Sequence, residues 1–267
     1  MKHTLKKLTW LGHNCFLFEY GKTKFITDPF LTPDSSPISA ENIEANYILV
    51  SHGHDDHCAD ALVIAKNNKS PIIAIPEVAG YFAQKGAATE PVNIGGAVYV
   101  PLFNDINLPK AQVLAVQAPH SSTLSNGAPG GNSLGFVLSF SQNEVCLSPN
   151  DGTIKPMRQT LEDASAFSIY FACDTGYFSE MSWIGRLGID LAVLPIGDRY
   201  TMGPSTSLDA IEAIQPRYVV PSHYNTWPPI SQNVEKWRDS VRKYTKSEPI
   251  LPIIGSSIEE QEDGSWR

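Results

Sequence analysis

The 267-residue sequence has little charge, few cysteines and no long apolar run. Charged residues make up 18%, below the roughly 25% typical of soluble domains. The net charge of −8 makes nucleic-acid backbones and anionic membranes unfavourable partners, because both would be repelled. No apolar run approaches the ~20 residues that span a bilayer, and the segment Met1 to Leu5 leads into strand-like sequence without the apolar region of a secretory leader.

The four cysteines, Cys15, Cys58, Cys146 and Cys173, are scattered without paired spacing. In a chain of this length they do not indicate a disulfide framework. We therefore expect a protein of the reduced cytoplasm.

Short apolar runs bounded by glycine and turn residues predict strands, and apolar spacing near 3.6 predicts helices. The predicted strands cover residues 5–10, 15–20, 24–27, 47–50, 71–75, 97–101, 112–117, 134–140, 144–147, 167–171, 191–195 and 218–220. The predicted helices cover residues 59–67, 77–85, 205–214 and 234–244. No helix or strand is predicted for the polar stretch 149–164. The acidic tail after Gly255 is expected to be loosely held.

Both halves of the chain show clustered strands followed by strand–helix alternation. There is no serine- or glycine-rich linker and no repeat of fixed period. Two sheets packed face to face, with helices outside, would bury the apolar strands on both sides. The pattern predicts an α/β fold, an αββα four-layer sandwich formed by residues 1–267 as a single domain.

The positions of the seven histidines carry the strongest functional signal. His52, His54 and His57 lie within six residues, directly after the buried strand predicted at 47–50. His120 and His223 also follow predicted strands, and His13 lies in the turn after the first strand.

Imidazoles and carboxylates are donors that suit Zn²⁺, Mn²⁺ or Fe. In an extended loop His52 and His54 point the same way, whereas Asp56 and His57 project differently where a helix begins. A lone histidine after a strand is usually a hydrogen-bonded loop residue, and this reading suits His120 or His223 taken singly. The dense cluster has no structural purpose without a cation, and a carboxylate such as Asp174, which follows an apolar strand, could bridge a second ion.

The segment His52-Gly53-His54-Asp55-Asp56-His57 resembles the His-x-His-x-Asp-His signature of metallo-β-lactamase-fold hydrolases. The resemblance implies two divalent ions, with Zn²⁺ as the first expectation and Mn²⁺ or Fe as alternatives. It assigns one ion to His52, His54 and His120, the other to Asp56, His57 and His223, and a bridging role to Asp174.

Residues 9–16, 27–30, 194–197 and 201–204 resemble a branch of bacterial metal-dependent hydrolases similar to ascorbate-6-phosphate lactonase. That resemblance implies that His13 and Asp28 lie close to the metals and take part in catalysis, although an Asp-Pro turn accounts for Asp28 equally well. Cys173 stands where the branch usually has glycine. The loop from Asp198 to Tyr200 and the stretch 142–166 also depart from its pattern.

The function that follows is hydrolysis of an ester or lactone by a hydroxide shared between two metal ions, with Asp56 orienting the hydroxide. The alternatives are a phosphodiesterase on the same centre and a non-catalytic metal-dependent binding or sensor protein. A cysteine nucleophile at Cys58 and a diiron redox centre are disfavoured. A small, anionic substrate and a homo-oligomer are compatible with the sequence, and the candidate substrate-binding residues are Arg199, Tyr200, Tyr224 and Asn225.

Overall fold

The computed structural model describes residues 4–32, 36–103, 111–142, 147 and 154–267. Its first sheet has the strand order β14-β1-β2-β3-β4-β5-β6 and its second β13-β12-β11-β10-β9-β8-β7. The strands of the first sheet are β1 (Lys6–Gly12), β2 (Cys15–Tyr20), β3 (Thr23–Thr27), β4 (Tyr47–Leu49), β5 (Ile72–Ala74), β6 (Thr89–Pro91) and β14 (Ser257–Glu259). Those of the second are β7 (Ala97–Val100), β8 (Ala111–Gln117), β9 (Leu134–Phe140), β10 (Phe167–Phe171), β11 (Leu191–Pro195), β12 (Tyr218–Ser222) and β13 (Glu248–Pro249).

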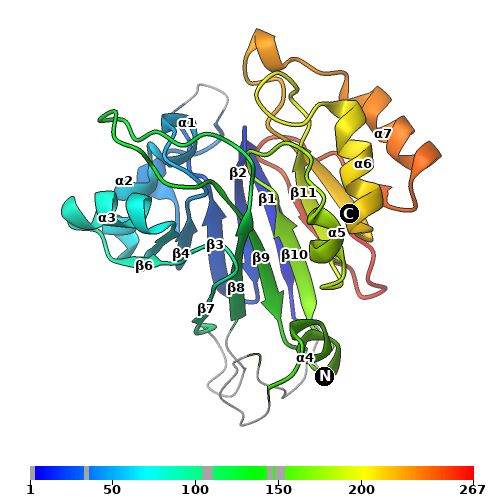
Figure 1. Cartoon of the computed structure of the whole chain (residues 1–267), viewed down its shortest axis with the longest axis horizontal. Coiled ribbons are helices and arrows are strands. Elements are labelled where there is room, and N and C mark those ends of the chain that lie inside the picture. The colour runs from blue at the N-terminus through cyan, green and yellow to red at the C-terminus, as the bar shows by residue number, and fades with distance from the viewer. Residues whose placement is uncertain (1–3, 33–35, 104–110, 143–146, 148–153) are drawn as a thin grey trace.

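The helices lie outside the two sheets. They are α1 (Asp55–Cys58), α2 (Ala61–Asn68), α3 (Pro76–Gln84), α4 (Met157–Asp163), α5 (Met181–Gly185), α6 (Pro204–Ile214) and α7 (Val234–Tyr244), with short 3-10 turns at Ala40–Asn42 and Pro228–Ile230. Figure 1 shows α2 and α3 on one flank of the paired sheets and α6 and α7 on the other. The predicted αββα sandwich is confirmed.

Each sheet is antiparallel in one part and parallel in the other. In the first sheet β14, β1, β2 and β3 are antiparallel neighbours, and β3 to β6 pair in parallel. The second sheet repeats this plan, with β7 to β10 antiparallel and β10 to β13 parallel. Parallel strands present their carboxyl ends on the same edge, and such edges are where α/β folds build their sites.

Aromatic side chains fill the space between the sheets. Phe18 of β2 lies 5.5 Å from Phe140 of β9, measured between ring centroids, and Tyr20 stacks on Phe140 at 4.3 Å. Phe16 meets Phe171 of β10 at 6.3 Å. Aromatic rings remove large apolar areas from water, so these contacts join the two sheets into one core.

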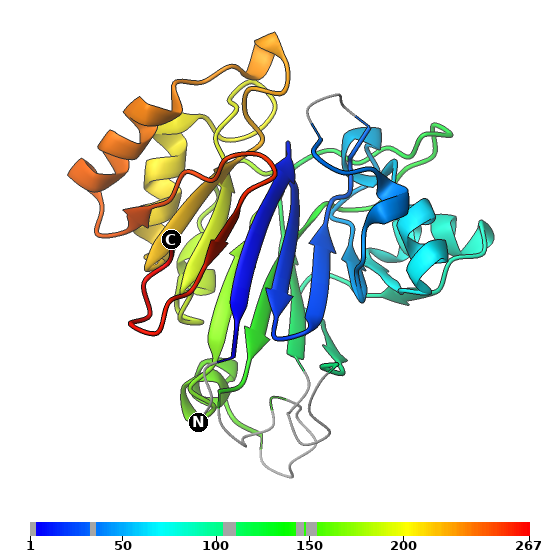
Figure 2. The same cartoon turned by 180° about the vertical axis from the view of Figure 1, so that it is seen from behind.

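The chain after Gly255 is ordered, and the prediction of a loosely held tail is wrong. β14 pairs with β1 at the edge of the first sheet, and Trp266 is buried with its ring stacked on Phe167. Figure 2 shows this last segment running beside β1. The tail is polar in composition, but its two apolar residues, Ile258 and Trp266, both point inward.

Two other predictions change in detail. The stretch 149–164, left without an element, contains α4 (Met157–Asp163), whose Leu161 is buried. The strand predicted at residues 144–147 lies outside the described residues except for Leu147. No helix in the described ranges is long and apolar enough to cross a membrane.

We expect Trp266→Ala to lower the free energy of unfolding by about 3 kcal/mol, the lower part of the range for a buried tryptophan, because β14 is a short edge strand. Chemical denaturation of the metal-free protein measures this change. Trp183→Ala is the control, because that ring is 43% exposed and its loss should cost much less. Equal destabilisation by the two substitutions would contradict the packed position of the tail.

Candidate metal centre

The motif that follows β4 is held between a buried strand and a short helix. All three residues of β4 are buried, so the chain leaves the core at Ser51 with a fixed direction. His52 and His54 lie in the loop, and α1 begins at Asp55 with His54 as its N-cap residue. Asp56 and His57 therefore project from the first turn of a helix, as predicted.

Three histidines form the first donor group. His52 Nε2 and His54 Nδ1 lie 2.9 Å apart, and His120 completes a group whose nitrogens all lie within 4.8 Å of one another. The loop carrying His120 is tied to the motif, because Gly53 N donates to Ser122 Oγ at 3.1 Å. This backbone-to-side-chain hydrogen bond joins the two loops, so that His54 and His120, 66 residues apart in the sequence, lie in one group.

Asp174 lies at the centre of the histidines. It follows β10, is 3% exposed, and places Oδ2 3.1 Å from His223 Nε2, 3.3 Å from His57 Nε2 and 3.5 Å from His120 Nε2. One carboxylate therefore faces histidines from both proposed metal positions. This is the geometry expected of a bridging ligand.

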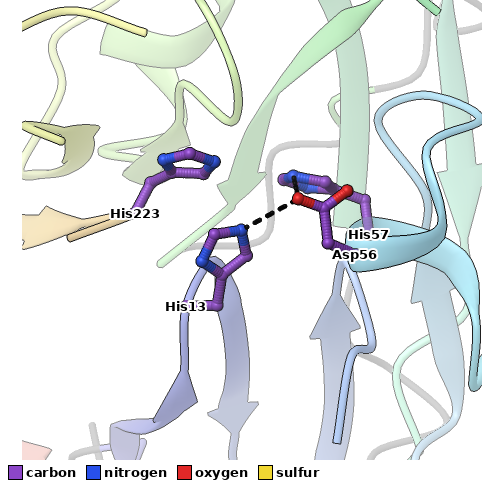
Figure 3. A group of neighbouring side chains, drawn as sticks. All are labelled: His13, Asp56, His57 and His223. Carbon is purple, nitrogen blue, oxygen red and sulfur yellow. Dashed lines mark ion pairs between the residues drawn. The ribbon is translucent and has the colours of Figure 1, made fainter. Parts of the chain in front are cut away.

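The second donor group comprises His13, Asp56, His57 and His223, whose donor atoms again lie within 4.8 Å of one another. Figure 3 shows His13 at the tip of the β1–β2 hairpin, turned toward the carboxylate of Asp56. His13 Nε2 lies 3.4 Å from Asp56 Oδ2, and His57 Nε2 lies 3.9 Å from it. The structure thus brings all seven predicted ligands and His13 to one end of the sandwich.

Asp28 lies behind the histidines and makes contact with His57. It is fully buried, and its oxygens accept from Ser51 N at 2.8 Å, Ser51 Oγ at 2.8 Å and His57 Nδ1 at 2.9 Å. Ser51 Oγ also lies 2.8 Å from His52 Nδ1. Ser51 Oγ donates its proton to Asp28, so it can only accept from His52, and Nδ1 of His52 must therefore be the protonated nitrogen. His57 Nδ1 likewise donates to Asp28. Nε2 of each histidine is then unprotonated and can bind a cation.

The charges in the site are unevenly distributed. Burial would lower the pKa of His57, but the carboxylates of Asp174 and Asp28 raise it well above its ordinary value. Burial lowers the pKa of His52, and the neighbouring imidazoles lower it further. Burial also lowers the pKa of His13 to about 4, although the nearby carboxylate of Asp56 acts in the opposite direction. Lowered pKa values favour the neutral imidazole at His52 and His13, and the neutral form is the one that binds metal.

The donor set fits metal ions. Within the described part of the chain, His13 Nε2, His57 Nε2 and Asp174 Oδ1 are buried without a hydrogen-bond partner. A buried polar atom without a partner is costly, and three of them gathered at one place need a common partner. Imidazole nitrogens and carboxylate oxygens are the donors that Zn²⁺, Mn²⁺ and Fe accept, so a metal ion satisfies them.

Cys173, which precedes Asp174, adopts the left-handed backbone conformation with φ +55°. Only glycine enters this region without cost, which accounts for the glycine usual at this position in the branch. The thiol is buried and burial raises its pKa well above the ordinary value, so it is a poor nucleophile. Burial likewise raises the pKa of Cys58 to about 12, which argues against the cysteine-nucleophile alternative.

The candidate substrate-binding residues lie in two settings. Arg199 and Tyr200 are exposed on a loop tied to the site, because Met202 N donates to Thr175 O at 2.9 Å. Tyr224 is buried with its ring stacked on Trp10, and the side-chain oxygen of Asn225 accepts from Gln232 N. Tyr224 and Asn225 thus have structural partners, and the substrate roles of all four residues stay predictions.

Sequence reasoning missed the residues that orient the ligands. Ser51 links Asp28 to His52, Asn14 Nδ2 donates to Asp28 at 3.2 Å, and Thr226 Oγ1 lies 2.8 Å from His13 Nδ1. Ser51 adjoins the predicted ligand His52, Thr226 lies three positions after the predicted ligand His223, and Asn14 adjoins His13, which was predicted to be catalytic. That adjacency was the available signal, since ligating histidines usually give their second nitrogen a polar partner.

We expect Gly197→Ala to weaken metal binding. A Cβ at Gly197 would lie 2.1 Å from the carbonyl oxygen of His223 and 3.2 Å from its Nδ1, so the loop that carries this ligand would have to move. Metal content after dialysis against a weak chelator measures the effect. Gly80→Ala in α3 is the control, because a Cβ there meets nothing within 4 Å, and unchanged metal retention in both variants would contradict the prediction.

Comparison with known proteins agrees with the geometry. Residues 7–164 match the family model of the beta-lactamase superfamily domain. A UPF0173 metal-dependent hydrolase of Desulforamulus reducens is 38% identical over 249 residues, which cover 91% of this chain and 94% of that protein. A solved metallo hydrolase, Igni18 of Ignicoccus hospitalis, superposes with a TM-score of 0.78 at 29% identity over 97% of this chain and 99% of that one.

The metallo-beta-lactamase fold protein YhfI of Bacillus subtilis superposes with a TM-score of 0.64 at 12% identity, over 96% of this chain and all of that one, and it supports the fold alone. The match to the superfamily model covers more than half of the sequence, and the relatives align along nearly its whole length. This chain belongs to the UPF0173 family of metal-dependent hydrolases, in the metallo-β-lactamase fold.

Proposed function

We propose that the chain hydrolyses a small ester or lactone at a centre of two divalent metal ions, with Zn²⁺ as the first candidate and Mn²⁺ or Fe as alternatives. One observation carries the proposal: Asp174 Oδ2 lies within 3.1–3.5 Å of His57, His120 and His223, between the two donor groups. A carboxylate in that position suits ions about 3.5–4 Å apart, which lower the pKa of a shared water to ~7 and polarise a carbonyl.

The residues of the chain position these parts. Asp28 and Ser51 fix the proton positions of His57 and His52, so that the free nitrogens face the centre. Asp56 is partly exposed, and its carboxylate lies between His13 and His57. It is therefore placed to orient the attacking water and to accept its proton.

A phosphodiester is the second candidate substrate because of Arg199. This exposed arginine lies on the loop that is hydrogen-bonded to Thr175, the neighbour of Asp174. The loop would therefore place the guanidinium group of Arg199 near an anionic group of the substrate. An anionic lactone would make the same contact. Arg199 therefore favours a negatively charged substrate but does not distinguish a lactone from a phosphodiester.

Removing the metals should abolish the activity. We expect dialysis against a strong chelator to lower the turnover of lactones by on the order of 10³-fold or more, since metal ions supply several kcal/mol of transition-state stabilisation. Zn²⁺, Mn²⁺ or Fe²⁺ is then added back singly, and lactones, carboxylic esters and phosphodiesters are assayed side by side. Activity that survives complete metal removal, or that persists in His54→Ala, would contradict the proposal, and binding of two metals with no turnover would favour a sensor.

A further inference from the structure

We propose that His13 is a direct ligand of the second metal ion, so that this position has four protein donors besides the bridging Asp174. The inference rests on the two-metal centre of the proposed function and extends it to a residue outside the His-x-His-x-Asp-His pattern. The four donors would be His13, Asp56, His57 and His223.

The distances suit a shared ion. Neighbouring donors around a five-coordinate ion with bonds of 2.0–2.1 Å lie about 2.9–3.6 Å apart. His13 Nε2 lies 3.4 Å from Asp56 Oδ2, and all four donor atoms lie within 4.8 Å of one another. Figure 3 shows the four side chains converging from three separate parts of the chain.

The nitrogen of His13 that faces this group is the available one. Nδ1 is engaged by Thr226 Oγ1 at 2.8 Å, whereas Nε2 is buried without a hydrogen-bond partner in the described residues. An imidazole whose far nitrogen contacts a hydroxyl, and whose near nitrogen points into a ligand group, has the arrangement of a metal-binding histidine.

The ring of His13 is held in this orientation from several sides. Trp227 packs edge-on against it with ring centroids 4.9 Å apart, and Phe30 does so at 6.0 Å. The backbone is left-handed at φ +50°, and the carbonyl of His13 accepts from Trp10 Nε1 and from the backbone N–H of His223, each at 3.1 Å. A non-glycine residue held in this conformation is strained, and such strain is typical of functional sites.

A fourth donor would make the two positions unequal. The first would have three imidazoles from His52, His54 and His120, and so an open place for water or substrate. The second would have five protein donors, counting Asp174, so it would hold its metal more tightly and have room only for the shared water. The second position should therefore fill first, and the first position should exchange its ion more easily.

Nuclear magnetic resonance on protein carrying ¹⁵N in its histidine side chains tests this without reference to activity. One and then two equivalents of Zn²⁺ are added to the metal-free protein, and the His13 signals are assigned from the spectrum of His13→Gln. We expect Nε2 of His13 to shift to the metal-bound position together with His57 and His223 at the first equivalent. His52, His54 and His120 should follow at the second.

Two variants accompany the spectra. His13→Gln should weaken binding of the first Zn²⁺ by about 100-fold or more in competition with a chelating dye, because loss of a donor exceeds the effect of losing a ligand's hydrogen-bond partner. Thr226→Val is the matched control, which keeps every donor and removes the Nδ1 contact, and it should cost about 10-fold. If His13→Gln does not fold, the His13 signals are assigned from through-space contacts with the ring of Trp227, 4.9 Å away, and the wild-type spectra remain decisive.

An unshifted His13 Nε2 after two equivalents would overturn the proposal and leave His13 as a proton-relay partner of Asp56. In that case two bound ions and metal-dependent hydrolysis would still support the proposed function. Failure to bind two ions at all would contradict the proposed function as well, so the two failures are distinguishable.

Discussion

Asp174→Asn is expected to lower kcat/KM by on the order of 10³-fold or more and to release at least one metal ion. Asp174 Oδ2 lies within 3.5 Å of three imidazole nitrogens, and its Oδ1 is buried with no hydrogen bond among the described residues. An amide has the same size but no charge, so it cannot neutralise two cations. Metal ions contribute several kcal/mol to such reactions, and each 1.36 kcal/mol is about tenfold in rate.

The measurement combines steady-state kinetics with metal analysis of the purified variant. Asp190→Asn is the control, because Asp190 precedes β11 at the opposite end from the metal centre and its carboxylate is likewise shielded in part from solvent. It should keep both metals and its activity. An Asp174→Asn protein with two metals and near-normal kcat/KM would show that this carboxylate does not bridge.

Asp28→Asn is expected to lower the free energy of unfolding by about 3 kcal/mol or more and to weaken metal binding by about 10–100-fold. Four donors converge on its two oxygens: Ser51 N, Ser51 Oγ, His57 Nδ1 and Asn14 Nδ2. The asparagine side chain has one oxygen where the carboxylate has two. Its NH₂ group would therefore face one of these donors at a fully buried position. A buried polar group left unsatisfied costs about 1–3 kcal/mol, more beside a charge.

Denaturation of the metal-free variant and competition with a chelating dye separate these two effects. Asp60→Asn is the control, because Asp60 Oδ2 accepts from Leu31 N and Thr32 Oγ1, and an asparagine oxygen can still take that place. Asp28→Asn with unchanged stability and metal affinity would reduce Asp28 to an Asp-Pro turn residue. That was the alternative reading of the sequence.

The metal ligands could be predicted because their positions depend on local features. A histidine that follows a buried strand within three residues lies at the end of a sheet, and His52, His120 and His223 all have this placement. Asp56 and His57 differ from His52 and His54 because α1 begins between them, and this change of direction was also visible in the spacing.

The elements that sequence reasoning missed depend on distant partners. β14 is three residues long and polar apart from Ile258, and its place follows only from pairing with β1 at the opposite end of the chain. β13 has two residues and exists only beside β12. Short strands have no periodicity to detect, so their pairing cannot be read from composition.

The roles of His13 and Asp28 became specific only in three dimensions. Their closeness to the metals was implied by resemblance, but the sequence did not distinguish a ligand from a supporting residue. The structure separates them: Asp28 contacts the far nitrogen of His57, whereas Nε2 of His13 faces the ligand group itself. The difference depends on which side of the imidazoles each residue approaches, and the fold alone determines that.

Anomalous X-ray diffraction from crystals of the Zn²⁺-loaded protein, measured at the zinc edge, tests the two-metal centre most directly. The account predicts two peaks about 3.5–4 Å apart on either side of Asp174. One peak should lie among His52, His54 and His120, and the other among His13, Asp56, His57 and His223. A single peak from fully loaded protein, or peaks away from Asp174, would contradict it.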